Sequence, residues 1–111
     1  MSVTSKPLYP AAYLGATDTT LYTATPGVRT ILDKVTAYNS DTGALLVSLN
    51  LVPNGGSLGA ANTVVSKTIA AGDTYTFPEV VGHVLESGGV LSGIAASASK
   101  VVIRVSGREV V

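Results

Sequence analysis

The segment Ala44-Leu-Leu-Val-Ser-Leu-Asn-Leu-Val52 carries the most regular pattern in this sequence, and it decides the fold class. Aliphatic residues occupy every second position from Leu45, so that Leu45, Val47, Leu49 and Leu51 alternate with Leu46, Ser48, Asn50 and Val52. Successive side chains of a β-strand point to opposite faces of its sheet. The alternation therefore predicts a strand with one face in the core and one mixed face.

Segments rich in β-branched residues lie on both sides of this one and are separated by turn residues. They predict strands at 20–24, 28–39, 63–70, 74–77, 90–96 and 100–106. Pro26-Gly27, the run from Asn39 to Gly43, and Ala71-Gly-Asp73 supply turns between them. Residues 79–86 have apolar residues at helical spacing, but Gly82 and three valines limit this segment to one or two helical turns.

About seven short strands separated by turn signals, with one weak helical segment, are typical of two packed antiparallel sheets. The sequence thus predicts an all-β domain, an antiparallel β-sandwich with a jelly-roll-like arrangement. A closed barrel is the alternative, because the pattern does not say whether the edge strands meet. Pro53-Asn-Gly-Gly-Ser57 breaks the central strand, and the small-residue stretch 58–62 then makes a loop long enough to cross between sheets. A chain of 111 residues is near the commonest domain size, so one core is expected.

Residues 1–18 read differently and predict an extended N-terminal arm that precedes a sandwich domain at 19–111. Pro7 and Pro10 remove two backbone hydrogen-bond donors, and the apolar residues of this segment follow no clear period. Two alternatives fit an arm of this kind. It lies across its own domain, or it reaches onto a neighbouring subunit.

Charged residues make up only 13% of the chain, and seven Lys and Arg balance seven Asp and Glu. Such a surface offers little protection against association, which favours an assembled state. The basic residues are scattered singly, so we expect no nucleic-acid partner. The chain has neither the basic start and apolar run of a signal peptide nor an apolar stretch approaching the roughly 20 residues that span a bilayer. We therefore expect a soluble protein made in the cytoplasm, without a membrane partner.

Catalytic and metal-binding patterns are missing. His83 is the only histidine, so any Ser-His-Asp arrangement would have to include it. It stands in the apolar stretch from Val80 to Leu85, where a structural histidine bonded to a backbone carbonyl is the favoured interpretation. The chain has no Cys, and its acidic residues lack the spacing of a calcium loop. We expect no catalytic residues, no metal ligands, no cofactor and no enzymatic activity.

Asp33 is an awkward residue within the longest predicted strand. Simple alternation places it on the same side as Ile31, Val35 and Ala37, where an unpaired charge is costly. The sequence predicts either a bulge that turns Asp33 outward or a bonded partner such as Arg29 or Arg104.

Three stretches resemble small all-β virion structural proteins of tailed bacteriophages. They are Thr20-Leu-Tyr-Thr-Ala-Thr-Pro-Gly-Val-Arg29, Val47-Ser-Leu-Asn-Leu-Val-Pro-Asn-Gly-Gly56 and Ala71-Gly-Asp-Thr-Tyr-Thr-Phe-Pro78. The resemblance runs from about Thr19 to the C-terminus. It implies a non-enzymatic accessory subunit of the capsid decoration or cement type, or of the neck, collar or tail. Such a subunit is located in the virion and assembles with copies of itself and with major capsid, neck or tail proteins.

The arm supplies the candidate protein-interface residues, because an extended segment can add strands or apolar anchors to a neighbouring subunit. The candidates are Leu8, Tyr9, Tyr13 and Leu14. The alternative function is a receptor- or glycan-binding domain of a phage tail tip or fibre. A sugar platform uses exposed aromatic side chains, and with no Trp and one Phe in the chain this role would fall to Tyr38 and Tyr75.

Overall fold

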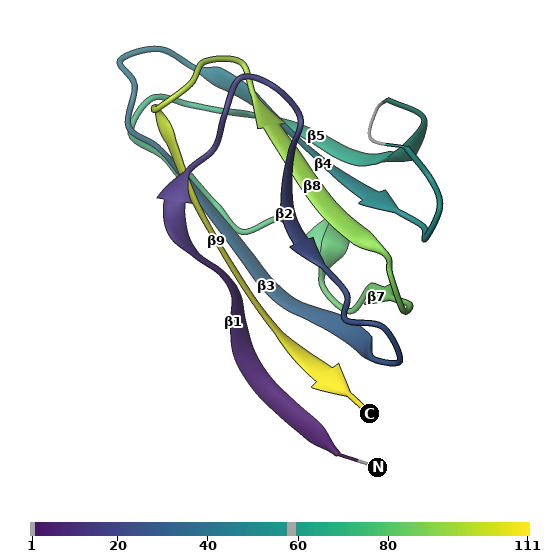
Figure 1. The fold of residues 1–111 in the computed structure, drawn as a ribbon. Coiled ribbons are helices and arrows are strands. Elements are labelled where there is room, and N and C mark those ends of the chain that lie inside the picture. The colour runs from purple at the N-terminus through teal and green to yellow at the C-terminus, as the bar shows by residue number, and fades with distance from the viewer. Residues whose placement is uncertain (1, 58–59) are drawn as a thin grey trace.

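A computed structural model describes residues 2–57 and 60–111 and confirms the all-β antiparallel sandwich. Two sheets face each other (Figure 1). Sheet A has the strand order β1-β9-β3-β6, with β7 also paired to β3, and sheet B has the order β2-β8-β4-β5. The elements are β1 (Val3–Tyr13), β2 (Thr19–Thr23), β3 (Arg29–Asn39), β4 (Leu45–Val52), η1 (Ala60–Asn62), β5 (Thr63–Ile69), β6 (Thr74–Tyr75), η2 (Pro78–Val80), β7 (Val84–Leu85), β8 (Val90–Ala95) and β9 (Val101–Val110). Since no strand pairing joins the two sheets within the described residues, the barrel alternative is wrong.

Strand β4 lies between β8 and β5. From Leu45 to Leu49 its residues alternate between buried and more exposed positions, as the sequence pattern predicts. Leu45, Val47 and Leu49 are buried against sheet A, whereas Leu46 points outward and is exposed. Burial of one such aliphatic side chain stabilises the fold by roughly 1.5–3 kcal/mol. The pattern ends at Asn50, which is buried on the outer face because it hydrogen-bonds side chains from neighbouring segments of sheet B.

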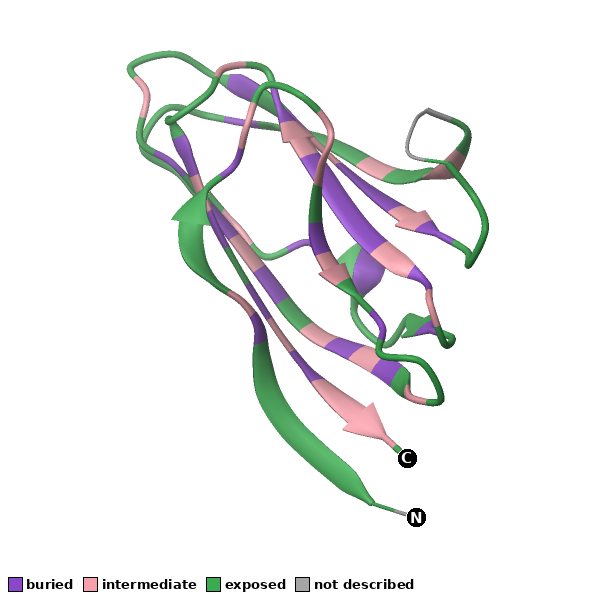
Figure 2. Cartoon of the chain, viewed as in Figure 1, coloured by how far each residue is buried: buried purple, intermediate pink, exposed green. Residues whose placement is uncertain are grey.

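The core fills the space between the sheets, and both sheets contribute to it (Figure 2). Its largest fully buried side chains are Phe77, Leu14, Leu32, Leu49, Leu91 and Ile103. Along strand β9, buried residues on the inner face of sheet A alternate with more exposed residues on its outer face. Val101, Ile103 and Val105 are fully buried, and Arg104 between them is exposed.

The weak helical segment is a single 3₁₀ turn, η2, followed by the short strand β7. Phe77 precedes the turn with a φ of 41° and has its ring fully buried. Gly82 ends the turn with a φ of +86°, a conformation that glycine adopts without steric cost. The chain then returns to an extended conformation beside β3.

Most of the segment expected to be an arm is strand β1, an edge strand paired antiparallel with β9. Residues 2–7 are exposed on both of their faces, because β1 and β9 extend past the end of sheet B (Figures 1 and 2). From Leu8 onward the segment packs on the sandwich, and Leu8 and Leu14 belong to the core. The described part of the segment therefore lies across its own domain as the edge strand of sheet A, next to β9. Met1 lies outside the described residues.

The stretch 53–62 does not cross between sheets, so that prediction is wrong. Strands β4 and β5 are neighbours in sheet B, paired from Leu45 with Ile69 to Asn50 with Thr63. The stretch is the long connection of a hairpin, and it includes the 3₁₀ turn η1. Its Leu58 and Gly59 lie outside the described residues.

Asp33 stands at an irregularity in β3, as the sequence predicts. The β3–β9 register shifts between Leu32 and Lys34. The predicted ion-pair partners are wrong, because Arg108 of β9 donates from Nε to both Asp33 oxygens, at 3.0 and 3.1 Å. Arg29 instead bonds Glu86 at 3.2 Å, and Arg104 stands opposite Thr36.

Candidate functional site

Tyr13, Val102 and Tyr38 form a row across three adjacent strands of sheet A. Tyr13 of β1 stands directly opposite Val102 of β9, which stands opposite Tyr38 of β3 on its other side. Directly opposed residues of antiparallel strands lie on one face, with Cβ atoms about 4.5–5.5 Å apart. The neighbours of Val102 along β9, Val101 and Ile103, are fully buried in the core. The three side chains therefore lie on the face of sheet A that points away from sheet B, and we call them the outer row.

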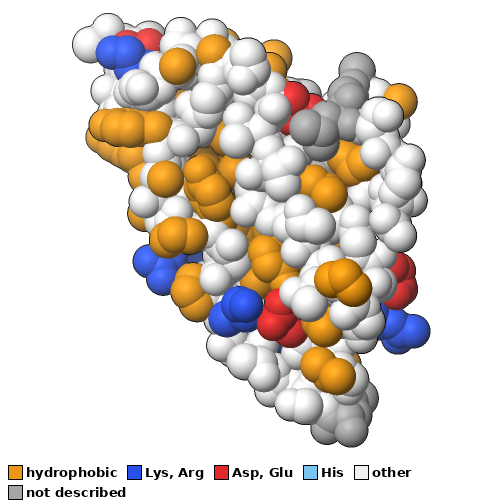
Figure 3. Space-filling view, in the orientation of Figure 1, with side chains coloured by type: hydrophobic (Ala, Val, Ile, Leu, Met, Phe, Trp, Pro, Cys, Tyr) orange, Lys and Arg blue, Asp and Glu red, His pale blue; other side chains and the backbone are white. Residues whose placement is uncertain are grey.

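The outer row is accessible to a partner. Tyr13 is 56% exposed and Tyr38 is 42% exposed, and both count among the large exposed apolar side chains. Figure 3 shows apolar side chains gathered on the side of the molecule along which β1 runs. A single exposed tyrosine needs no explanation, but here two exposed tyrosines flank a valine on the same face of the sheet. Tyrosine is enriched in protein interfaces because it buries a large area and retains a polar group.

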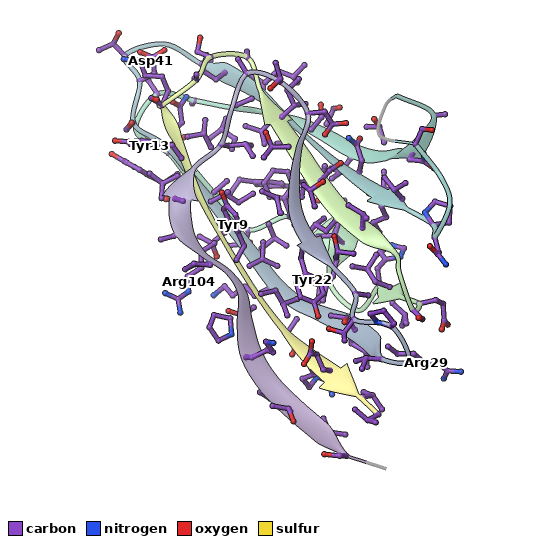
Figure 4. All side chains as sticks on the ribbon, viewed as in Figure 1. Tyr9, Tyr13, Tyr22, Arg29, Asp41 and Arg104 are labelled. Carbon is purple, nitrogen blue, oxygen red and sulfur yellow. The ribbon has the colours of Figure 1, made fainter. Side chains whose placement is uncertain are left out.

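Two cations continue this face beyond the outer row. Arg104 lies two residues from Val102 along β9, and Lys34 stands opposite Ser106 on the same face. Both are exposed, and within the described residues neither has a carboxylate oxygen within 4.0 Å. Figure 4 shows Tyr13 and Arg104 both pointing away from sheet B. The outer face of sheet A thus combines an aromatic end with a basic middle.

The four interface candidates from the sequence have different positions. Tyr13 is exposed in the outer row, and Tyr9 is half-buried against the core. Leu8 and Leu14 are core residues whose side chains pack on glycines: Leu8 contacts the Gly107 position of β9, and Leu14 that of Gly93 in β8. These two leucines hold β1 and the segment after it on the sandwich, and Tyr13 alone of the four presents most of its side chain to solvent.

A second surface feature is an apolar pocket of about 340 Å³ between sheet B and β7. Its lining is mainly aliphatic, and it comprises Leu51, Val52, Pro53, Asn54, Val64, His83, Val84, Leu85, Glu86 and Gly89. The sequence interpretation of His83 as a bonded residue in apolar surroundings is wrong, because His83 is exposed at this pocket. Its hydrogen bonds are made by its backbone, which donates to Val80 and accepts from Leu32.

Tyr38 and Tyr75 do not form a common aromatic platform. Tyr38 opposes Thr74, and Ala37 opposes Tyr75, so the two rings lie on opposite faces of sheet A. The Tyr75 ring packs edge-to-face on Phe77 with centroids 4.8 Å apart, and Lys67 Nζ lies 5.1 Å from its centroid. Phe77 and Lys67 thus pack against the Tyr75 ring. The predicted pair of sugar-binding tyrosines is therefore not supported.

A polar link joins the two sheets near the C-terminal end of β9. Tyr22 of β2 donates its hydroxyl hydrogen to Glu109 of β9, and Lys6 Nζ lies 3.5 Å from the same carboxylate. The Tyr22 hydrogen bond lowers the pKa of Glu109 below its ordinary value, with a smaller contribution from Lys6. Burial raises the pKa of Tyr22, and the hydrogen bond to Glu109 raises it further. The ionised carboxylate and the neutral phenol therefore stabilise each other at neutral pH.

The described residues contain no group of three or more His, Cys, Asp or Glu side chains that could hold a metal ion. Among the same residues, no helix has the length and apolar character needed to cross a membrane.

Neither a protein-family model nor a curated protein matches this chain. Among solved structures it is similar to chains from the Gt strain of infectious bursal disease virus (TM-score 0.40, 13% identity) and from the T13 viral particle of the same virus (TM-score 0.42, 12% identity). It is also similar to the VP2 subviral particle of that virus (TM-score 0.38, 14% identity). Each match covers 97% of this chain and 30–32% of the other chain, so the chain spans about a third of their length.

Proposed function

We propose that this chain is a non-enzymatic structural subunit of a bacteriophage particle. It assembles on the particle, as a capsid decoration or cement protein or as part of the neck or collar, through contacts with copies of itself and with other virion proteins. The observation that carries the assembly role is the outer row of Tyr13, Val102 and Tyr38. The resemblance of three sequence segments to small phage virion proteins is the reason for proposing a bacteriophage particle.

The outer row has the composition of an interface centre. Interface cores are enriched in tyrosine and depleted in charge, while arginine is common among residues that dominate binding. Tyr13 and Tyr38 supply exposed aromatic area, and Arg104 stands beside them without a carboxylate partner among the described residues. The low charge of the chain adds little long-range repulsion between copies. A flat apolar patch with a basic flank fits a protein surface of mixed apolar and acidic character.

The segments that carry the resemblance build the framework of the domain. Thr20–Arg29 contains all of β2 except Thr19, together with the turn into β3, where Gly27 has a φ of +80°. Residues 71–78 contain the turn into β6, where Gly72 has a φ of +75°. These residues make the fold possible, and the residues of the outer row, which lie outside them, are available for contact with partners.

The proposal is tested first by the protein inventory of purified particles. Mass spectrometry is expected to find the chain in particles, and its absence from them rejects a virion role. The interface is tested by changing Tyr13 and Tyr38 together to Ser, which removes both rings from the exposed face while leaving the core unchanged. We expect the amount bound to particles to fall at least tenfold, with the melting temperature changed by no more than a few degrees.

The matched control is Val64→Ser, because Val64 is 44% exposed on β5 of sheet B, away from the outer row. This control is expected to bind particles like the unchanged chain. Equal loss in the control and the double variant, or no loss in either, would show that the outer row is not the interface.

A further inference from the structure

The free edge of β1 has a fixed set of backbone groups that point away from its own sheet. Ser2 and Val111 exchange backbone hydrogen bonds of 3.1 and 2.9 Å, and the register continues without a shift from Val3 opposite Val110 to Pro7 opposite Ser106. In an antiparallel ladder, hydrogen-bonded pairs alternate with pairs that are not hydrogen-bonded. Thr4 and Lys6 therefore bond to β9. The backbone groups of Val3, Ser5 and Pro7 point to the free edge.

The two halves of this edge differ in how well they are protected against pairing. Pro7 has no N–H to offer at the free edge, and Pro10 follows it. The register also shifts between Pro7 and Tyr9 and again between Tyr9 and Ala12. Prolines and bulges of this kind discourage a further strand from adding to an edge. Residues 2–6 have neither, so they form a straight and unprotected edge.

Residues 2–6 are also accessible. All of them are exposed on both faces, and in Figure 1 no other strand of the described residues runs along the outer side of β1. The one charge in this half, Lys6, belongs to a position bonded to β9, and its ammonium lies 3.5 Å from Glu109. The charge that would oppose an incoming strand is thus partly neutralised within the protomer.

We propose that this edge pairs with the same edge of a second copy, as antiparallel strands centred on Thr4. In this register Val3 exchanges two backbone hydrogen bonds with Ser5 of the second copy, and the symmetric pair exchanges two more. Thr4 faces Thr4 of the second copy, and Ser2 faces Lys6 of the second copy, so no like charges are opposed. Sheet A then continues from one copy into the next.

The two-fold register follows from the spacing of the free groups. Val3 and Ser5 each offer a donor and an acceptor, placed symmetrically about Thr4, so a two-fold axis at Thr4 satisfies all four groups of each copy. A shift that opposed Ser5 to itself would place Pro7 at a hydrogen-bonded position, where it has no donor. A two-fold axis at Thr4 relates two identical strands, so the partner that pairs with this edge is another copy of this chain.

This contact deepens the proposed function and rests on it. Five residues on each side make a small interface, well under the roughly 1,200 Å² of stable complexes. The contact is therefore weak between free copies. It becomes effective when other contacts on a particle raise the local concentration of the edge.

Single cysteines test the register, since the chain has none of its own. Opposed residues in a pair that is not hydrogen-bonded have Cα atoms about 4.5 Å apart, within the range that a disulfide spans. With the chain assembled on particles, we expect Thr4→Cys to form a covalent dimer under mild oxidation at least tenfold faster than Ser2→Cys or Lys6→Cys. A mixture of the S2C and K6C proteins is expected to cross-link, because these positions face each other.

Ser5→Pro supplies the matched control in the T4C background. It removes a donor at the free edge and leaves the hydrogen bonds to β9 in place, as Pro7 does naturally two positions later. We expect it to lower the T4C dimer yield to that of the S2C protein. Equal yields at positions 2, 4 and 6, no dimer, or a yield unchanged by S5P would overturn the proposed pairing.

The same variants separate this inference from the proposed function. If the chain is found in particles but T4C does not dimerise there, the structural role stands and the edge contact is rejected. Cross-linking of T4C to a different virion protein would also reject pairing between copies.

Discussion

Gly107 of β9 is a position that residues of both neighbouring strands, β1 and β3, approach closely. A Cβ atom at this position would lie 2.5 Å from the carbonyl oxygen of Ile31 and 2.7 Å from Cδ1 of Leu8. Both distances are too short for real carbon contacts, so only glycine allows Leu8 to pack across β9. The absence of a side chain at Gly107 therefore lets Leu8 fix β1 on the sheet.

Gly107→Ala is expected to lower the free energy of unfolding by about 1–3 kcal/mol, because the added methyl must displace Leu8 or the β3 backbone. Urea denaturation followed by circular dichroism measures the change. Gly43→Ala is the matched control, since a Cβ there meets nothing within 4 Å and the backbone is not left-handed. Similar losses for the two variants would contradict this account of Gly107.

At the scale of elements, the link between Tyr22 of sheet B and Glu109 of sheet A joins two strands that share no ladder. The pKa of Glu109 is lower in the folded state than its ordinary value of 4.5. Its contribution to stability is therefore present above pH 4.5 and is lost as the pH falls through the folded-state value. The pKa of Tyr22 is raised above 10.0, so its contribution is present below pH 10 and is lost as the pH rises through its folded-state value.

Tyr22→Phe removes this link while keeping the ring. We expect the variant to be less stable than the unchanged chain at pH 7, with a difference that shrinks as the pH falls below 4.5. Thermal unfolding at a series of pH values between 2 and 7 provides the measurement. Tyr13→Phe, which changes an exposed hydroxyl, serves as the control and is expected to show no pH-dependent difference. A Tyr22→Phe difference that stayed constant with pH would exclude Glu109 as the partner.

The sequence predicts strands β2 to β5 within about two residues at each end, because their alternation and turns are local signals. It does not identify β1, since its two register shifts break the period of two and its prolines remove the usual strand signal. It also ends the last strand at Ser106, because Gly107 reads as a strand end while the structure continues β9 to Val110. Within β9, Gly107 allows the close approach of Leu8 and of the Ile31 carbonyl oxygen.

The candidate site depends on register and is harder to predict. Tyr13 and Tyr38 meet through Val102, which lies far from both in sequence. Local patterns place each residue on a strand face but do not say which strands are neighbours or how they are aligned. The Asp33–Arg108 pair has the same origin, since a separation of 75 residues makes the partner a property of the fold.

For the whole molecule, β1 is part of the sandwich and not a removable tail. Deletion of residues 2–14 would remove an edge strand together with the core residues Leu8 and Leu14. Loss of one buried leucine side chain costs about 2–5 kcal/mol, and small domains are stable by about 5–15 kcal/mol. We expect this deletion to abolish cooperative thermal unfolding.

Deletion of residues 2–6 alone is the control, because these residues contribute no buried side chain. We expect it to retain a cooperative transition by circular dichroism while losing the edge contact between copies. If the longer deletion also unfolded cooperatively, the packing of β1 on the sandwich would be dispensable for folding.

The position of β9 between β1 and β3 also sets the order of events during synthesis. Lys6 and Glu109, which meet across β1 and β9, are separated by 103 residues. At translation rates of about 5–20 residues per second, the first strand waits roughly 5 to 20 s for its partner to emerge from the ribosome. During that interval both of its edges are open, and Pro7 and Pro10 remove two backbone donors that a strand pairing with it would otherwise use.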